Sequence, residues 1–139
     1  MELPSILINQ IKEKNVVLFL GSGASVGSIH PDGKMIPTGK ELSRSIAQKF
    51  LGGGFEDRSL AEIGELAVSE TDLFTVQEFI ASLYYEFQPA SFHKIIPTFA
   101  WAAIVTTNYD LIIERAYDQV RDRLQTPVPF KKNTEKIEE

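Results

Sequence analysis

Residues 16–25 read VVLFLGSGAS, an apolar run that ends abruptly at a glycine. Five consecutive apolar residues of this kind are typical of a strand buried on both faces in a parallel sheet. The glycines at positions 21 and 23 let the backbone turn tightly and approach a ligand closely. Free backbone N–H groups in such a loop suit a phosphate group, and the alternative is a purely structural turn.

The glycine loop does not satisfy the standard nucleotide-binding fingerprints. The sixth place of the dinucleotide pattern holds Val26 where glycine is needed, and Gly27 comes one residue late. The P-loop pattern also fails, because the GK pairs at 33–34 and 39–40 are followed by methionine and glutamate. A kinase or ATPase of the P-loop class is therefore disfavoured.

A second apolar run, AAIVT at 102–106, continues into the polar turn TNYD at 107–110. In open parallel sheets, ligands bind beyond the carboxyl ends of the strands. If the two runs are parallel strands, the glycine loop and this polar turn meet at the same edge of the sheet. The alternative for Asn108 or Asp110 is an N-cap of the helix that follows.

The remaining pattern is helical. Thr38 and Glu41 form a capping-box pattern at the start of a helix that ends near residue 50, and Ser5 is the expected N-cap of the first helix. Apolar spacing predicts helices at 5–14, 38–50, 59–68, 75–87, 91–96 and 111–124. The fold class is therefore α/β, a Rossmann-like parallel sheet with a helical insertion.

The number of strands is small for such a fold. Two strands alone rarely make a stable sheet. We therefore expect residues 1–139 to form one incomplete domain, the N-terminal portion of a longer protein. The charged end at 130–139 is expected to be a mobile tail or a link to the missing part.

Composition limits the possible functions. The 139 residues carry a net charge of −5, which disfavours a broad nucleic-acid footprint. There is no cysteine and there are only two histidines, so we expect no disulfide and no metal site within these residues. The longest apolar stretches are far shorter than the roughly 20 residues that span a bilayer, and the expected location is the cytoplasm.

Together, the two polar clusters resemble the sirtuin family, in particular its bacterial defence-associated branch. The matching residues are VVLFLGSGAS at 16–25, IPT at 36–38 with EL at 41–42, and IVTTNYD at 104–110 with Glu114. The match spans about residues 15–117 in the same order. Either motif alone is a weak signal, whereas the pair is fairly specific.

The resemblance implies that the chain binds NAD as a substrate. In the family, the asparagine of the second motif lies at the nicotinamide ribose and is catalytic, which assigns that role to Asn108. The Asp of that motif helps to place the nicotinamide end, and a proline lies in a mobile cofactor loop. The implied NAD-binding residues are Gly21, Ser22, Gly23, Ala24, Ser25, Pro37, Thr107, Asn108 and Asp110.

The resemblance also implies an activity. Two features favour the defence branch: the residues of the TTNYD motif, and an IPT segment that lacks the arginine of the deacetylase loop. Members of that branch hydrolyse NAD to ADP-ribose and nicotinamide, and so deplete the infected cell of NAD. Homo-oligomers and a sensor or effector partner are common there, and the helices between Leu60 and Phe87 are candidate interfaces. The alternatives are an NAD-dependent protein deacylase, a non-catalytic nucleotide-sensing or interaction module, and a plain structural domain.

One feature departs from the family. Sirtuins use a histidine as general base, and it lies later in the chain than the asparagine motif. No histidine follows Asn108 in this sequence. His30, beside a Pro-Asp-Gly turn, is interpreted as a turn residue, and His93 as a packed or capping residue. The base is therefore expected in a longer protein, and otherwise the protein is inactive.

Overall fold

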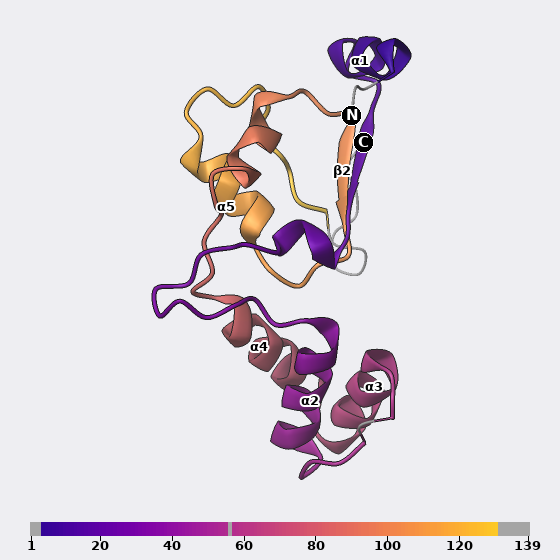
Figure 1. The fold of residues 1–139 in the computed structure, drawn as a ribbon. Helices are drawn as coiled ribbons and strands as arrows, with labels where there is room; N and C mark the ends of the chain where they lie inside the picture. Colours follow the sequence, from indigo (N-terminus) through magenta and orange to yellow (C-terminus); the bar gives the residue numbers. More distant parts are fainter. Residues whose placement is uncertain (1–3, 56, 131–139) are drawn as a thin grey trace.

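The computed structural model describes residues 4–55 and 57–130. Figure 1 shows the two strands side by side. The helix α1 lies beyond one end of the sheet, α5 lies beside the sheet, and α2, α3 and α4 are grouped beyond its other end. In chain order, the elements are α1 (Ser5–Lys12), β1 (Val17–Leu20), the 3₁₀ helix η1 (Ser22–Ser25), α2 (Gly39–Phe50), α3 (Leu60–Glu70), α4 (Leu73–Tyr84), the 3₁₀ helix η2 (His93–Thr98), β2 (Ala103–Thr106) and α5 (Ile112–Gln119).

The two strands form a parallel pair. Val17 lies opposite Ala103, and the register continues to Leu20 opposite Thr106. The carboxyl ends of β1 and β2 therefore meet at one edge, as the sequence predicted, and η1 follows β1 directly at that edge. Within the described residues the sheet has these two strands, and the chain is an α/β protein with a helical insertion between them.

The expectation that the strands are buried on both faces is wrong. Val17 and Phe19, which share one face of β1, are 55% and 65% exposed, and Val105 on β2 is also exposed. Leu18 and Leu20 on the opposite face are only partly covered. The reason is that the inserted helices pack on one another and not on the sheet (Figure 1).

The main apolar core lies inside the helical insertion. Its buried residues come from α2, α3 and α4, and they are Leu42, Ile46, Ala47, Ile63, Ala67, Val76 and Tyr84. Thr38 and Glu41 make the predicted capping box at the start of α2, and Ser59 with Glu62 makes a second one at the start of α3. Three well-terminated amphipathic helices thus cover one another's apolar faces.

A second buried group joins η2 to α5. Ile112, Ala116 and Tyr117 of α5 are buried, as are His93 and Pro97 of η2. This pair lies beside the sheet, and it connects the chain segments on either side of β2 (Figure 1). The polar turn after β2 is therefore supported by a packed helix.

Several predicted helix boundaries differ from the structure. Pro4, not Ser5, is the N-cap of α1, and no side chain caps this helix. α4 begins earlier than predicted because the Asp72 carboxylate accepts a hydrogen bond from the Thr75 amide. α5 ends at Gln119, five residues before the predicted end. Apart from position 130, the predicted mobile tail lies outside the described residues. No helix that the structure describes is long and apolar enough to cross a membrane.

Candidate functional site

The glycine loop and the polar turn meet at the carboxyl edge of the sheet. The Ser25 hydroxyl donates to Oδ2 of Asp110 at 2.6 Å, and Nδ2 of Asn108 donates to the same hydroxyl oxygen at 2.8 Å. The Thr107 amide also donates to the Leu20 carbonyl at 3.3 Å, which extends the pairing of the strands by one step. Residues more than 80 positions apart thus form one polar cluster, as the parallel arrangement predicted.

The direction of these hydrogen bonds fixes the Asn108 amide. A carboxylate can only accept, so Ser25 must use its single proton on Asp110. The Ser25 oxygen can then only accept from Asn108, and the amide must present its NH₂ group on that side. Oδ1 of Asn108 consequently points away from Ser25, and it is buried with no hydrogen-bond partner among the described residues.

An unpaired buried oxygen is costly. A buried polar atom without a partner costs about 1–3 kcal/mol, and native proteins contain few of them. Asn108 is held in this orientation by a network that is itself well satisfied. The Oδ1 atom is therefore an acceptor set in place for a donor that the described chain does not supply, such as a ligand hydroxyl or a water molecule.

Asp110 is largely committed to holding the site together. Its Oδ2 accepts from Ser25, and its Oδ1 accepts from the Ile112 amide at 3.0 Å, at the first residue of α5. The carboxylate is buried, but the alternative that Asp110 is the N-cap is wrong, because Leu111 is the N-cap of α5 and makes no side-chain capping hydrogen bond. Asp110 therefore connects the start of α5 to the glycine loop through Ser25.

The first two glycines of the loop are not explained by the fold. A Cβ atom added at Gly21 or at Gly23 would meet no atom within 4 Å, and neither residue adopts a positive φ. Gly27 is different, because its φ is +84° and an added Cβ would lie 3.2 Å from the ring of Phe92. The chain itself thus requires glycine at 27, whereas at 21 and 23 it leaves open space.

His93 is buried beneath the glycine loop. Its side chain accepts a hydrogen bond at Nδ1 from the Ala90 amide at 2.9 Å, and its Nε2 lies 2.8 Å from the Ala24 carbonyl oxygen. Since Nδ1 accepts, the ring proton is on Nε2 and is donated to Ala24. The residue is 1% exposed, in agreement with its interpretation as a packed histidine.

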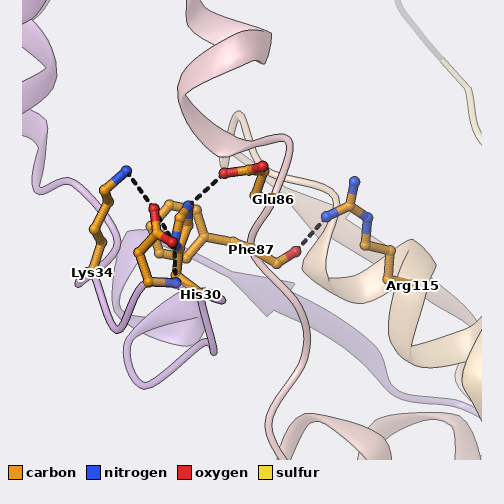
Figure 2. A network of polar contacts seen from close by, with 6 residues as sticks. His30, Lys34, Glu86, Phe87 and Arg115 are labelled. Carbon is orange, nitrogen blue, oxygen red and sulfur yellow. Dashed lines mark hydrogen bonds and ion pairs between the residues drawn. The ribbon is translucent and has the colours of Figure 1, made fainter.

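His30 is buried in the segment that follows the glycine loop (Figure 2). Its Nδ1 accepts from the Asp32 amide at 3.0 Å, within the predicted turn, and its Nε2 lies 3.0 Å from the Glu86 carboxylate just after α4. Asp32 also pairs with Lys34. His30, Asp32 and Glu86 are three potential metal ligands, but both ring nitrogens already have partners.

This polar network fastens the loop to the helical insertion and to α5. Ile29 and Gln88 exchange two backbone hydrogen bonds of 2.8 and 2.7 Å beside it. The Arg115 guanidinium of α5 donates to the Phe87 carbonyl, as Figure 2 shows. The segment between the glycine loop and α2 is therefore held at its midpoint rather than left free.

Sequence reasoning missed Tyr84 as a neighbour of the site. It lies at the end of α4, and burial raises the pKa of its hydroxyl to about 12, with the negative charge of Asp110 adding to the shift. The apolar spacing of α4 predicts a core residue at this position, and nothing in the local sequence indicates its proximity to Asp110. The end of α4 is thus near enough to Asp110 for the charge of that carboxylate to act on the Tyr84 hydroxyl.

The other predicted residues are less tightly connected. Ser22 and Thr107 are exposed at the sheet edge, and Pro37 is half-buried directly before the N-cap of α2. Pro37 takes no part in the hydrogen-bond network of Ser25, Asn108 and Asp110 within the described residues. Two hollows on the described surface lie elsewhere, one along residues 118–126 and one between the starts of α2 and α3.

Comparison with known proteins adds no relative. No protein-family model matches the chain, and no curated protein or solved structure is significantly similar to it. The assignment of a function therefore rests on the motifs and on the geometry at the sheet edge.

Proposed function

We propose that this chain is the NAD-binding part of a sirtuin-like NAD glycohydrolase that acts in antiphage defence by depleting NAD. The observation that carries the proposal is the meeting of the two motifs, in which Ser25 and Asp110 hold Asn108 with its Oδ1 unpaired. The complete protein is proposed to have a Rossmann-like sheet, to which β1 and β2 contribute neighbouring strands.

The chemistry requires little beyond orientation. The bond between nicotinamide nitrogen and ribose C1′ breaks, and nicotinamide leaves with the bonding electron pair, which neutralises its pyridinium charge. The ribose then passes through an oxocarbenium-like state that water captures at C1′, and that water loses a proton. Oδ1 of Asn108 can accept from a ribose hydroxyl or from the attacking water, and so can hold one of them in line.

The glycine loop leaves space in which the rest of the nucleotide can bind. Open space at Gly21 and Gly23 lets a ligand approach the backbone, and a side chain at either position would enter that space. Backbone amides near the start of a short helical turn suit the diphosphate of NAD. This support is independent of the Asn108 geometry, because it comes from the other motif.

The general base is proposed to come from a part of the protein beyond these residues. His93 uses both ring nitrogens on backbone groups of this chain, and His30 is engaged by Asp32 and Glu86. Neither ring is available to take a proton at Asn108. A second function, NAD binding without turnover, is favoured by the same observation if no such base exists.

The test is titration of NAD by calorimetry, together with chromatographic detection of nicotinamide release. Gly23→Val should abolish binding, whereas Gly64→Val, at a glycine in α3 with equally open surroundings, should leave the affinity unchanged. Asn108→Ala should abolish nicotinamide release by a protein that is active. Binding that survives Gly23→Val, or no binding by the unaltered protein, contradicts the proposal. Because the general base is proposed to lie beyond these residues, nicotinamide release is measured on a protein that includes that part, and binding without release by such a protein supports the non-catalytic alternative.

A further inference from the structure

We infer that His93 is a positioning residue for the candidate site, and that it acts by holding the glycine loop through the Ala24 carbonyl. The inference rests on the proposed function for its link to NAD. It starts from a histidine that is 1% exposed and whose two ring nitrogens each have a defined backbone partner.

The two contacts of the ring do different things. Nδ1 accepts from the Ala90 amide three residues earlier, which is a local contact at the start of η2. Nε2 donates to the Ala24 carbonyl, 69 residues away in sequence, which is a long-range contact with η1. The local contact forms part of the turn before η2, whereas the long-range contact determines where the glycine loop sits on η2.

Holding this carbonyl also orients the polar cluster. The Ala24 carbonyl belongs to the rigid, planar peptide unit that joins Ala24 to Ser25, so fixing its direction fixes how the chain enters Ser25. Ser25 is the residue that receives the Asn108 amide and donates to Asp110. A continuous series of contacts thus runs from His93 through Ala24 and Ser25 to the unpaired oxygen of Asn108.

The hydrogen bonds inside the glycine loop do not replace this restraint. Within the loop, the Val26 amide donates to the Gly23 carbonyl at 3.3 Å, and the Ser28 hydroxyl donates to the Ser25 carbonyl at 2.5 Å. Both bonds stay inside the loop and its immediate continuation, so they shape the loop without attaching it to η2. The ring of Phe92 lies against His93, at 4.0 Å between ring centres, and supports the ring from the side.

Two substitutions separate the two nitrogen positions. His93→Gln places an amide NH₂ where Nε2 was and so keeps a donor for Ala24. His93→Asn places an amide oxygen where Nδ1 was, so it keeps the acceptor for Ala90 and loses the long-range donor. The pair therefore distinguishes the restraint of the loop from local structure in η2, which a single deletion of the side chain would not.

The experiment measures NAD affinity by calorimetry and amide hydrogen exchange of residues 22–28 by mass spectrometry. His93→Asn should weaken NAD binding by about three- to tenfold, the size of one lost hydrogen bond, and should speed exchange in the loop but not in α4. His93→Gln should restore both. The inference is overturned if the two variants behave alike, that is, if both resemble the unaltered protein or if both are impaired to the same extent.

Failure of the proposed function would be recognised separately. If the unaltered protein does not bind NAD, the proposed function is wrong, and loop exchange alone decides the role of His93. If His93→Asn does not fold, His93→Gln decides it, because the donor is retained there and the local acceptor is changed. Normal loop protection in that variant supports the inference, and lost protection overturns it.

Discussion

Replacing Ser25 by alanine tests whether the meeting of the two motifs stabilises the protein. Ser25 is 2% exposed, and its hydroxyl lies between two partners, the Asp110 carboxylate at 2.6 Å and the Asn108 amide at 2.8 Å. Ser25→Ala removes both hydrogen bonds with one change and does not alter the backbone conformation that the loop can adopt. Each former partner then faces a methyl group.

The expected cost follows from the type of each bond. A hydrogen bond to a charged group contributes about 1.5–3 kcal/mol, and a neutral one contributes about 0.5–1.5 kcal/mol. Asp110 keeps the Ile112 amide as a partner, so its carboxylate is not left entirely without a donor. We therefore expect the free energy of unfolding to fall by about 2–4 kcal/mol, a large fraction of what a domain of this size possesses.

The assay is urea denaturation followed by circular dichroism, with Ser22→Ala as the matched control. Ser22 lies in the same 3₁₀ helix, but its side chain is exposed, so its removal should change the free energy of unfolding by less than about 0.5 kcal/mol. Equal stabilities of the two variants would refute the reasoning, because the cluster would then contribute nothing to the attachment of the loop to β2 and α5.

Three further predictions concern the rest of the fold. Burial raises the pKa of Tyr84 to about 12, so the folded state holds this proton more tightly than the unfolded chain does. The free energy of unfolding should therefore decline as the pH rises from about 10 to about 12, and Tyr84→Phe should reduce the decline by roughly 1–2 kcal/mol in urea titrations at each pH. Thr38→Ala should lower the free energy of unfolding by about 1 kcal/mol at pH 7 in the same urea titrations. Because hydrogen bonds that Thr38 donates to the Glu41 carboxylate lower the pKa of Glu41, this difference should shrink as the pH falls below about 4.5. Gly27→Ala should lower the unfolding free energy by roughly 1–2 kcal/mol because its φ is +84°, whereas Gly64→Ala within α3 should raise it by up to about 1 kcal/mol; equal effects would show that backbone strain at position 27 is unimportant.

The parts of the fold that local sequence determines were predictable. The capping box of Thr38 and Glu41 specifies where α2 begins without help from distant residues. The abrupt change from apolar residues to glycine at position 21 likewise specifies where β1 ends. The meeting of Ser25 with Asn108 followed from one topological rule, that parallel strands place their carboxyl ends together.

The parts that depend on tertiary packing were not predictable. The apolar run of β1 indicated a strand with both faces covered, yet Phe19 is mostly exposed because α2, α3 and α4 bury their apolar faces against one another. The sequence alone could classify His93 as packed but could not identify Ala24 as its partner 69 residues away. The same applies to Tyr84, whose proximity to Asp110 depends on how α4 packs.

The residues that form the apolar core of this chain are largely different from the residues that form the candidate site. The helical insertion contains most of the buried apolar residues and both capping boxes, so its stability depends on its own packing. The candidate site instead depends on a few long-range polar contacts, namely those of Ser25, Asn108 and His93. Buried polar contacts of this kind lose most when a single partner is removed. Substitutions at these three positions should therefore loosen the glycine loop directly as well as lower the free energy of unfolding, and the exchange of loop amides reports the first of these effects by itself.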